Sequence, residues 1–172
     1  MNLLFRILFY KLTGLFRKPL RFPETSILKM KVFPTDLDIY GHMNNGRYLT
    51  LMDLGRMDWA KRVGLLDTAH RKKWSPLVAS IMIRYRRPFQ VFDSFNLQTR
   101  VVGWDDKWLY LEQQFKRGGV VLSSAVVKCI FRGREGNISM PRLLGELGVD
   151  ASSGVVPDYL KKWEEVERAS KR

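Results

Sequence analysis

The sequence predicts an α+β domain in which an antiparallel sheet packs against one long helix. Three observations support this fold class. One strand-like run precedes a long helical run, and four strand-like runs follow it. Short polar stretches, WDD and KRGG, separate the last three runs and are typical of hairpin turns between antiparallel strands. A chain of 172 residues is also long enough to form one domain with a substantial core.

The first strand and the helix are recognised by their local signals. SILKMKVFP, residues 26–34, is predicted as a strand that Pro34 ends, because proline cannot donate a hydrogen bond to a ladder. RYLTLMDLGRMDWAKRVGLL, residues 47–66, is predicted as one helix because its apolar side chains recur at helical spacing. Gly64 suits the C-terminal end of that helix.

The other strands follow the helix in order. They are expected over residues 77–89, 94–104, 107–115 and 119–131. Residues 136–172 are expected to form a tail of short surface helices. The chain is therefore divided into an N-terminal segment, residues 1–22, a body, residues 23–135, and this tail.

The N-terminal segment, residues 1–22, predicts a basic amphipathic helix. Its apolar residues share one broad helical face, and basic residues lie at both margins of that face. This pattern is typical of a helix that lies in a membrane interface, and the segment is too short and too interrupted to span a bilayer. We expect an anionic membrane surface as a partner and a cytoplasmic protein that is peripheral on the membrane. The alternative is a helix packed on the body or on a partner subunit. The basic residues are Arg6, Lys11, Arg17, Lys18 and Arg21.

Charge and cysteine content exclude several classes of site. The net charge is +13, but zinc-ligand spacing, a helix-turn-helix signal and aromatic-rich nucleic-acid motifs are missing, so no nucleic-acid partner is expected. The single cysteine, Cys129, excludes an internal disulfide and a multi-cysteine metal site, and its apolar surroundings predict a buried, unreactive thiol. His70 lies in a polar stretch and is expected to be solvated. No metal and no cofactor are expected.

The stretch DLDIYGHMNN, residues 36–45, carries the densest polar chemistry in the chain. A structural interpretation is that Asn44 or Asn45 caps the long helix, while Gly41 permits a tight turn. A functional interpretation is that the unpaired amides of the helix N-terminus stabilise an oxyanion beside a carboxylate. Such a carboxylate attacks a carbonyl or takes a proton from water, which amounts to acyl transfer to water.

The same segment supports a family resemblance. FPTDLDIYGHMNNGRYLTLMD resembles the D-x-D-x-x-G-H-x-N-N-x-x-Y signature of hot-dog-fold thioesterases of the 4-hydroxybenzoyl-CoA thioesterase type. The blocks GLL and PFQVFDSFNLQTRVVGWDDKWLYLEQQF are similar to the thioesterase-superfamily-member-six group. The resemblance implies a hot-dog fold, with a sheet of about five strands wrapped around a central helix. It also implies an acyl-CoA thioesterase for fatty or aromatic acyl groups, assembled as a homodimer or a dimer of dimers.

The resemblance assigns roles to individual residues. Asp38 matches the catalytic carboxylate, acting as nucleophile or general base, and the backbone N–H of Asn45 matches the donor to the thioester oxygen. Asp53 matches a second candidate carboxylate on the helix, although an ion pair with Arg56 explains it equally well. The other motif positions are expected to order the loop: Asp36, Gly41, His42 and Asn44.

Two functions remain open from the sequence. The first is acyl-CoA hydrolysis, and the second is a membrane-associated acyl-CoA-binding or scaffold protein without turnover. Substitution of Asp38 distinguishes them. Candidate contacts for the CoA phosphates are Arg84, Arg86, Arg87, Lys128, Arg132 and Arg134.

Overall fold

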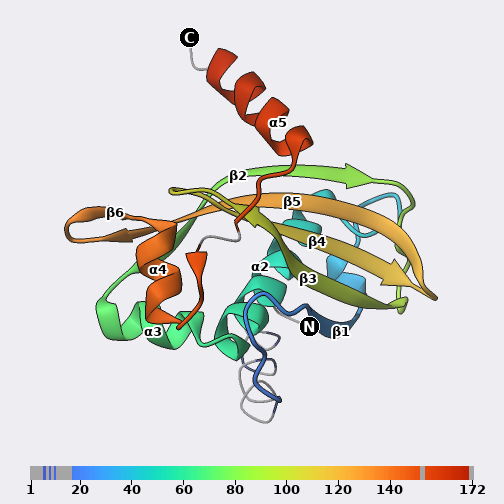
Figure 1. Cartoon of the computed structure of the whole chain (residues 1–172). Helices are drawn as coiled ribbons and strands as arrows, with labels where there is room; N and C mark the ends of the chain where they lie inside the picture. The colour runs from blue at the N-terminus through green and yellow to red at the C-terminus, as the bar shows by residue number, and fades with distance from the viewer. Residues whose placement is uncertain (1–5, 7, 9, 11–16, 152–153, 171–172) are drawn as a thin grey trace.

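The computed structural model describes residues 6, 8, 10, 17–151 and 154–170. Within these residues one antiparallel sheet has the order β1-β3-β4-β5-β2, and the short β6 pairs with β5 (Figure 1). The strands are β1 Ser26–Lys31, β2 Ser75–Tyr85, β3 Ser94–Trp104, β4 Leu109–Arg117, β5 Val120–Gly133 and β6 Gly136–Ile138. The predicted α+β architecture is therefore confirmed, with β6 as an addition to the five expected strands.

Helix α2, Asn45–Arg62, lies against the inner face of the curved sheet (Figure 1). Its buried side chains include Tyr48, Leu51, Met52, Leu54 and Trp59. Gly55 allows the helix to approach β3 closely, because a Cβ at this position would lie 2.7 Å from a methyl carbon of Leu97. The helix and the sheet thus share one core.

The helical run of residues 47–66 ends near Gly64, the residue that the sequence offers as its C-terminal end. Helix α2 ends at Arg62, and Gly64 adopts a left-handed conformation with φ 79°. A second helix, α3, Leu65–Lys72, then begins and buries Leu65, Thr68 and Ala69. Helix α3 was not predicted as a separate element because Leu65 and Leu66 fit the end of the preceding helical run and the stretch that follows them, DTAHRK, is polar. His70 is exposed on it, as expected.

Two strands end earlier than predicted. Strand β1 ends at Lys31 because Pro34 begins a short 3-10 turn, Pro34–Asp36. Strand β2 ends at Tyr85, so Arg86 and Arg87 lie beyond it, although both backbone amides still donate to the carbonyl oxygen of Leu122.

The C-terminal tail, expected to consist of short surface helices, begins inside the sheet. Strand β6 lies within the range assigned to the tail, because it pairs with the end of β5. Helices α4, Met140–Glu146, and α5, Asp158–Ala169, follow. Leu160 of α5 packs against Tyr110 and Val126 on the outer face of the sheet. The body and the tail therefore form one packed unit.

Buried polar groups tie α5 to the sheet. The Lys128 ammonium lies 2.7 Å from Glu164 and 3.0 Å from Glu167, and its side chain is buried. Lys128 is thus engaged by α5 rather than presented to a ligand. On the same strand, Cys129 is buried, as expected, and burial raises the pKa of its thiol to about 11.

Candidate active site

The loop between β1 and α2 is a compact turn held by its own backbone. The Asp38 N–H donates to the His42 carbonyl at 2.8 Å, and the Gly41 N–H donates to the Asp38 carbonyl at 3.1 Å. Gly41 has φ 76°, a left-handed conformation that favours glycine, as the tight-turn interpretation expects. The Met43 N–H donates to Phe89 at 2.9 Å, which ties the loop to the chain after β2.

The Asp38 carboxylate is half-buried within this turn. Its Oδ1 accepts hydrogen bonds from the backbone amides of Tyr40, at 2.9 Å, and His42, at 3.3 Å. Among the residues that the structure describes, no group donates to Oδ2. Asp38 is therefore oriented through one oxygen and leaves the other for a substrate or a water molecule.

The first amide of α2 is that of Asn45, next to the cap residue Asn44. The Asn44 side chain caps the helix by accepting from the Gly46 N–H at 2.8 Å, and the Asn44 carbonyl accepts from Arg47 N–H at 2.9 Å. Within the described part of the chain, the Asn45 N–H has no hydrogen-bond partner. Amides at this position carry the positive end of the helix dipole, so this N–H is suited to a developing oxyanion.

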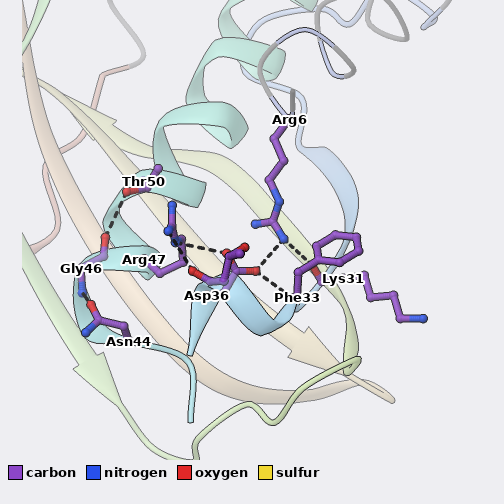
Figure 2. Close-up of polar contacts among 9 residues, drawn as sticks. Arg6, Lys31, Phe33, Asp36, Asn44, Gly46, Arg47 and Thr50 are labelled. Atoms are coloured by element: carbon purple, nitrogen blue, oxygen red, sulfur yellow. Dashed lines mark hydrogen bonds and ion pairs between the residues drawn. The ribbon is translucent and has the colours of Figure 1, made fainter. Parts of the chain in front are cut away.

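Asp36 lies at the centre of a buried ion-pair network (Figure 2). Its Oδ2 accepts from Arg6 at 2.6 Å and from the Phe33 N–H at 2.8 Å, while its Oδ1 lies 3.1 Å from the Arg47 Nε. The Asp36 side chain is 1% exposed and that of Arg6 is 3% exposed. Sequence reasoning placed Arg6 at the margin of a membrane-facing helix. No local sequence pattern indicates that Arg6 pairs with Asp36, thirty positions away.

A cavity of about 390 Å³ lies between α2 and the sheet. Its walls are mostly apolar side chains from helices α2 and α3 and from strands β2, β4 and β5. Asp53 and Arg56 line it and form an ion pair with each other. Arg56 is only 11% exposed and also donates to Gln113 at 2.8 Å, whereas Asp53 is 66% exposed. Asp53 lies about 12 Å further along the helix axis than Asn45, at 1.5 Å per residue.

The arginine candidates divide between the two ends of β2. The Tyr85 hydroxyl donates to the Asn45 carbonyl at 3.2 Å, so the end of β2 lies beside the start of α2. Arg84, Arg86 and Arg87 are exposed at this end. Arg132 pairs with Ser75 at the opposite end, about 30 Å away along the strand, since each residue adds about 3.3 Å. Exposed Arg134 follows it, so only the first three arginines lie near the loop.

Part of the N-terminal segment packs on the body. Residues 1–5, 7, 9 and 11–16 lie outside the described residues, so most of the predicted amphipathic helix does too. Arg6, Leu8 and Tyr10 have helical backbone. The Arg17 guanidinium lies 3.2 Å from Asp58, and the Leu20 N–H donates to Arg62 at 2.9 Å. The described residues contain no helix that is long and apolar enough to cross a membrane.

The described residues include no group of three or more His, Cys, Asp or Glu side chains arranged to hold a metal ion.

The chain is similar to known proteins over most of its length. The family model of the thioesterase-like superfamily matches residues 32–154. Protein THEM6 from Danio rerio is 37% identical over 127 residues, which cover 72% of this chain and 63% of that protein. Protein THEM6 from Drosophila melanogaster is 29% identical over 166 residues, which cover 94% of this chain and 84% of that protein. The chain thus spans less than two thirds of the length of the Danio rerio relative.

A solved structure shows the same fold. The BH1999 gentisyl-coenzyme A thioesterase superposes with a TM-score of 0.61 at 18% identity. The superposition covers 71% of this chain and 98% of that chain.

Proposed function

This chain belongs to the thioesterase-like superfamily and has the expected hot-dog fold, and from this premise we propose that it hydrolyses acyl-CoA thioesters at the loop of residues 36–45. The observation that carries the proposal is that one turn contains both a carboxylate oxygen and a backbone amide that lack hydrogen-bond partners among the described residues. The Oδ2 of Asp38 and the N–H of Asn45 have no partner among the described residues, and both belong to the turn that opens α2. Thioester hydrolysis needs a group of each kind.

In the proposed reaction, the thioester oxygen accepts a hydrogen bond from the Asn45 N–H, which stabilises the charge that develops on it. Asp38 then acts in one of two ways. As a general base it takes a proton from water, which adds to the carbonyl carbon and expels the CoA thiolate. As a nucleophile it attacks that carbon itself, expels the thiolate and forms an anhydride that water cleaves. Both routes release a carboxylic acid and CoA thiol.

The acyl group is proposed to occupy the cavity between α2 and the sheet. An apolar cavity of about 390 Å³ favours a fatty or aromatic acyl group, because burial of its hydrocarbon surface stabilises the complex. Arg84, Arg86 and Arg87 are proposed contacts for the CoA phosphates, since guanidinium groups bind phosphate through paired hydrogen bonds. Asp53 is proposed as a second carboxylate at this cavity, held by Arg56.

The protein is proposed to act as a homodimer or a dimer of dimers that pair through β2. At the other sheet edge, β1, two side chains already occupy backbone carbonyls: Arg6 donates to the Lys31 carbonyl at 2.9 Å and the Tyr10 hydroxyl to the Lys29 carbonyl at 3.1 Å. On β2, Leu77, Val78 and Met82 are 41–45% exposed. An open, apolar edge strand favours pairing with another strand.

We also propose that residues 1–22 attach the protein to an anionic membrane surface. The packing of Arg6 and Arg17 on the body leaves Lys18 and Arg21 as the exposed basic side chains of the described part of this segment.

One observation favours the alternative function, a membrane-associated acyl-CoA-binding or scaffold protein without turnover. Asp38 accepts two backbone hydrogen bonds, and these give the carboxylate a structural reason to be present in the turn.

Thiol release from a panel of acyl-CoAs, measured for wild type, D38N and D67N, tests the choice. D38N keeps the Oδ1 acceptor but lacks the charge, so kcat is expected to fall by at least ~10²–10⁴-fold while acyl-CoA binding and the melting temperature stay close to wild type. D67N is the control, because Asp67 is an exposed residue of α3 that pairs with Lys61. Wild-type turnover by a D38N protein that melts well below wild type would favour the structural role.

A further inference from the structure

The contact between Arg6 and Asp36 joins the N-terminal segment to the candidate active site. Figure 2 shows the Arg6 side chain reaching Asp36 from one side while Arg47 approaches from the other. The Arg6 Nη2 donates both to Asp36 and to the Lys31 carbonyl, and its guanidinium lies 4.8 Å from the centre of the Phe33 ring. Arg6 is thereby held against the end of β1 and the turn that follows it.

Asp36 in turn connects Arg6 to the surroundings of both proposed catalytic groups, the Asp38 carboxylate and the Asn45 amide. Its carbonyl oxygen accepts from the Asn44 N–H at 2.8 Å, so it fixes the helix cap that directly precedes Asn45. Its carboxylate also binds Arg47 in the first turn of α2, at 3.1 Å. On the loop side, Asp36 is separated from Asp38 by a single residue. The relative position of Asp38 and Asn45 therefore depends on how Asp36 is held.

The burial of this pair argues for a positioning role rather than for added stability alone. Removing two charges from water is costly, and a buried pair compensates fully only when all its hydrogen bonds are made. The Arg6 Nη1 is buried and has no acceptor among the described residues. The pair is thus costly to bury and incompletely bonded, yet it lies where the loop and the helix meet.

We propose that Arg6 is a positioning residue for thioester hydrolysis. It acts through Asp36 to fix the position of the Asp38 turn relative to the Asn45 amide. This inference rests on the proposed function of the loop. It makes the N-terminal segment part of the active site as well as a candidate membrane contact.

The test compares R6Q with R17Q in the full-length protein. Arg17 is a matched control, because it also joins the N-terminal segment to an acidic side chain of α2, but at Asp58, near the far end of the helix. R6Q is expected to lower kcat up to roughly a hundredfold with little change in KM, because small displacements of catalytic groups have effects of this size. R17Q is expected to keep the wild-type kcat.

Hydrogen exchange supplies a readout that does not depend on activity. The amides of Asp38, Met43 and Asn44 are hydrogen-bonded within or beside the loop. R6Q is expected to speed their exchange, while R17Q is expected to leave it at the wild-type rate. Equal effects of R6Q and R17Q on kcat and on loop exchange, or no effect of R6Q on either, would overturn the proposal.

The double variant R6Q/D36N covers the case in which R6Q does not fold. It removes the Arg6 and Asp36 charges together, so the buried Asp36 charge is not left with Arg47 in place of its two arginine partners. It is expected to show lowered kcat and faster loop exchange, and a folded double variant with wild-type values of both would overturn the proposal. If wild type releases no thiol from any acyl-CoA, the proposed function fails, whereas the exchange measurements still decide whether Arg6 holds the loop.

Discussion

The side chain of Asn44 accepts a hydrogen bond from the backbone N–H of Gly46 at 2.8 Å, and this bond defines where α2 begins. Of the two asparagines that the sequence offers as caps, Asn44 is therefore the cap. The neighbouring Asn45 is left to present its backbone N–H.

This division of roles predicts different effects for two alanine variants. N44A removes the cap and is expected to destabilise the protein by about 1 kcal/mol and to lower kcat, because the first turn of α2 frays. N45A keeps the backbone N–H and is expected to have a smaller effect on both. Thermal unfolding and thiol-release kinetics measure the two effects. An N45A variant that loses as much as N44A would contradict the assignment.

The open edge at β2 predicts the mode of assembly. M82K introduces a charge in the middle of the exposed β2 strand and is expected to shift the protein towards monomer in light scattering at micromolar concentration, because lysine on an edge strand opposes pairing. I27K is the control: Ile27 is 51% exposed on β1, the edge where Arg6 and Tyr10 occupy backbone carbonyls. Loss of the dimer in I27K but not in M82K would place the interface on β1 and contradict the prediction.

The proposed membrane contact predicts a charge-dependent affinity for vesicles. The double variant K18Q/R21Q is expected to bind anionic vesicles about 30-fold more weakly, since each basic side chain near such a surface contributes about 1 kcal/mol. Wild-type binding is expected to weaken as salt rises.

The matched control for this experiment is K161Q/K162Q, which removes two exposed charges from α5. Equal loss of vesicle binding in the two double variants would show that net charge, rather than the N-terminal segment, drives the association.

The contact between α5 and the sheet predicts an acid-sensitive stability. Burial would raise the pKa of Glu164, but hydrogen bonds from Lys128 and Tyr110 outweigh it and hold the pKa below its ordinary value. For Glu167, burial is likewise outweighed by hydrogen bonds from Ser80 and Lys128, which lower its pKa. Stability from lowered pKa values is complete above the unfolded-state pKa of glutamate, about 4.3, and is lost as pH falls through the folded-state values.

Melting temperatures measured between pH 7 and pH 3 test this dependence. Wild type is expected to lose stability as pH falls below about 4.3. K128M is expected to melt lower at pH 7, with a flatter or reversed dependence on acid, because its two glutamates lack their counterion. E165Q, at an exposed position on the same helix, is expected to follow wild type. If the melting temperature of K128M falls with pH in parallel with that of wild type, the ion pairs of Lys128 are not the cause of the acid sensitivity.

Much of the architecture is determined by the sequence alone, because it depends on local spacing. Apolar residues at helical spacing identify α2, hairpin turns order strands β3 to β5, and the polar stretch DLDIYGHMNN marks the turn that opens α2. Gly64, which suits a helix end, does lie in a left-handed conformation just beyond α2, whereas the separate helix α3 that follows it was not predicted.

The tertiary structure alone decides which polar groups meet and which remain free. The Arg6–Asp36 pair joins residues thirty positions apart, and no local pattern reports such a contact. That the Oδ2 of Asp38 and the N–H of Asn45 have no partner within the described part of the chain is likewise apparent only from the positions of the neighbouring donors and acceptors. Sequence spacing determines secondary structure through short-range geometry, whereas burial and pairing of charges depend on the path of the whole chain.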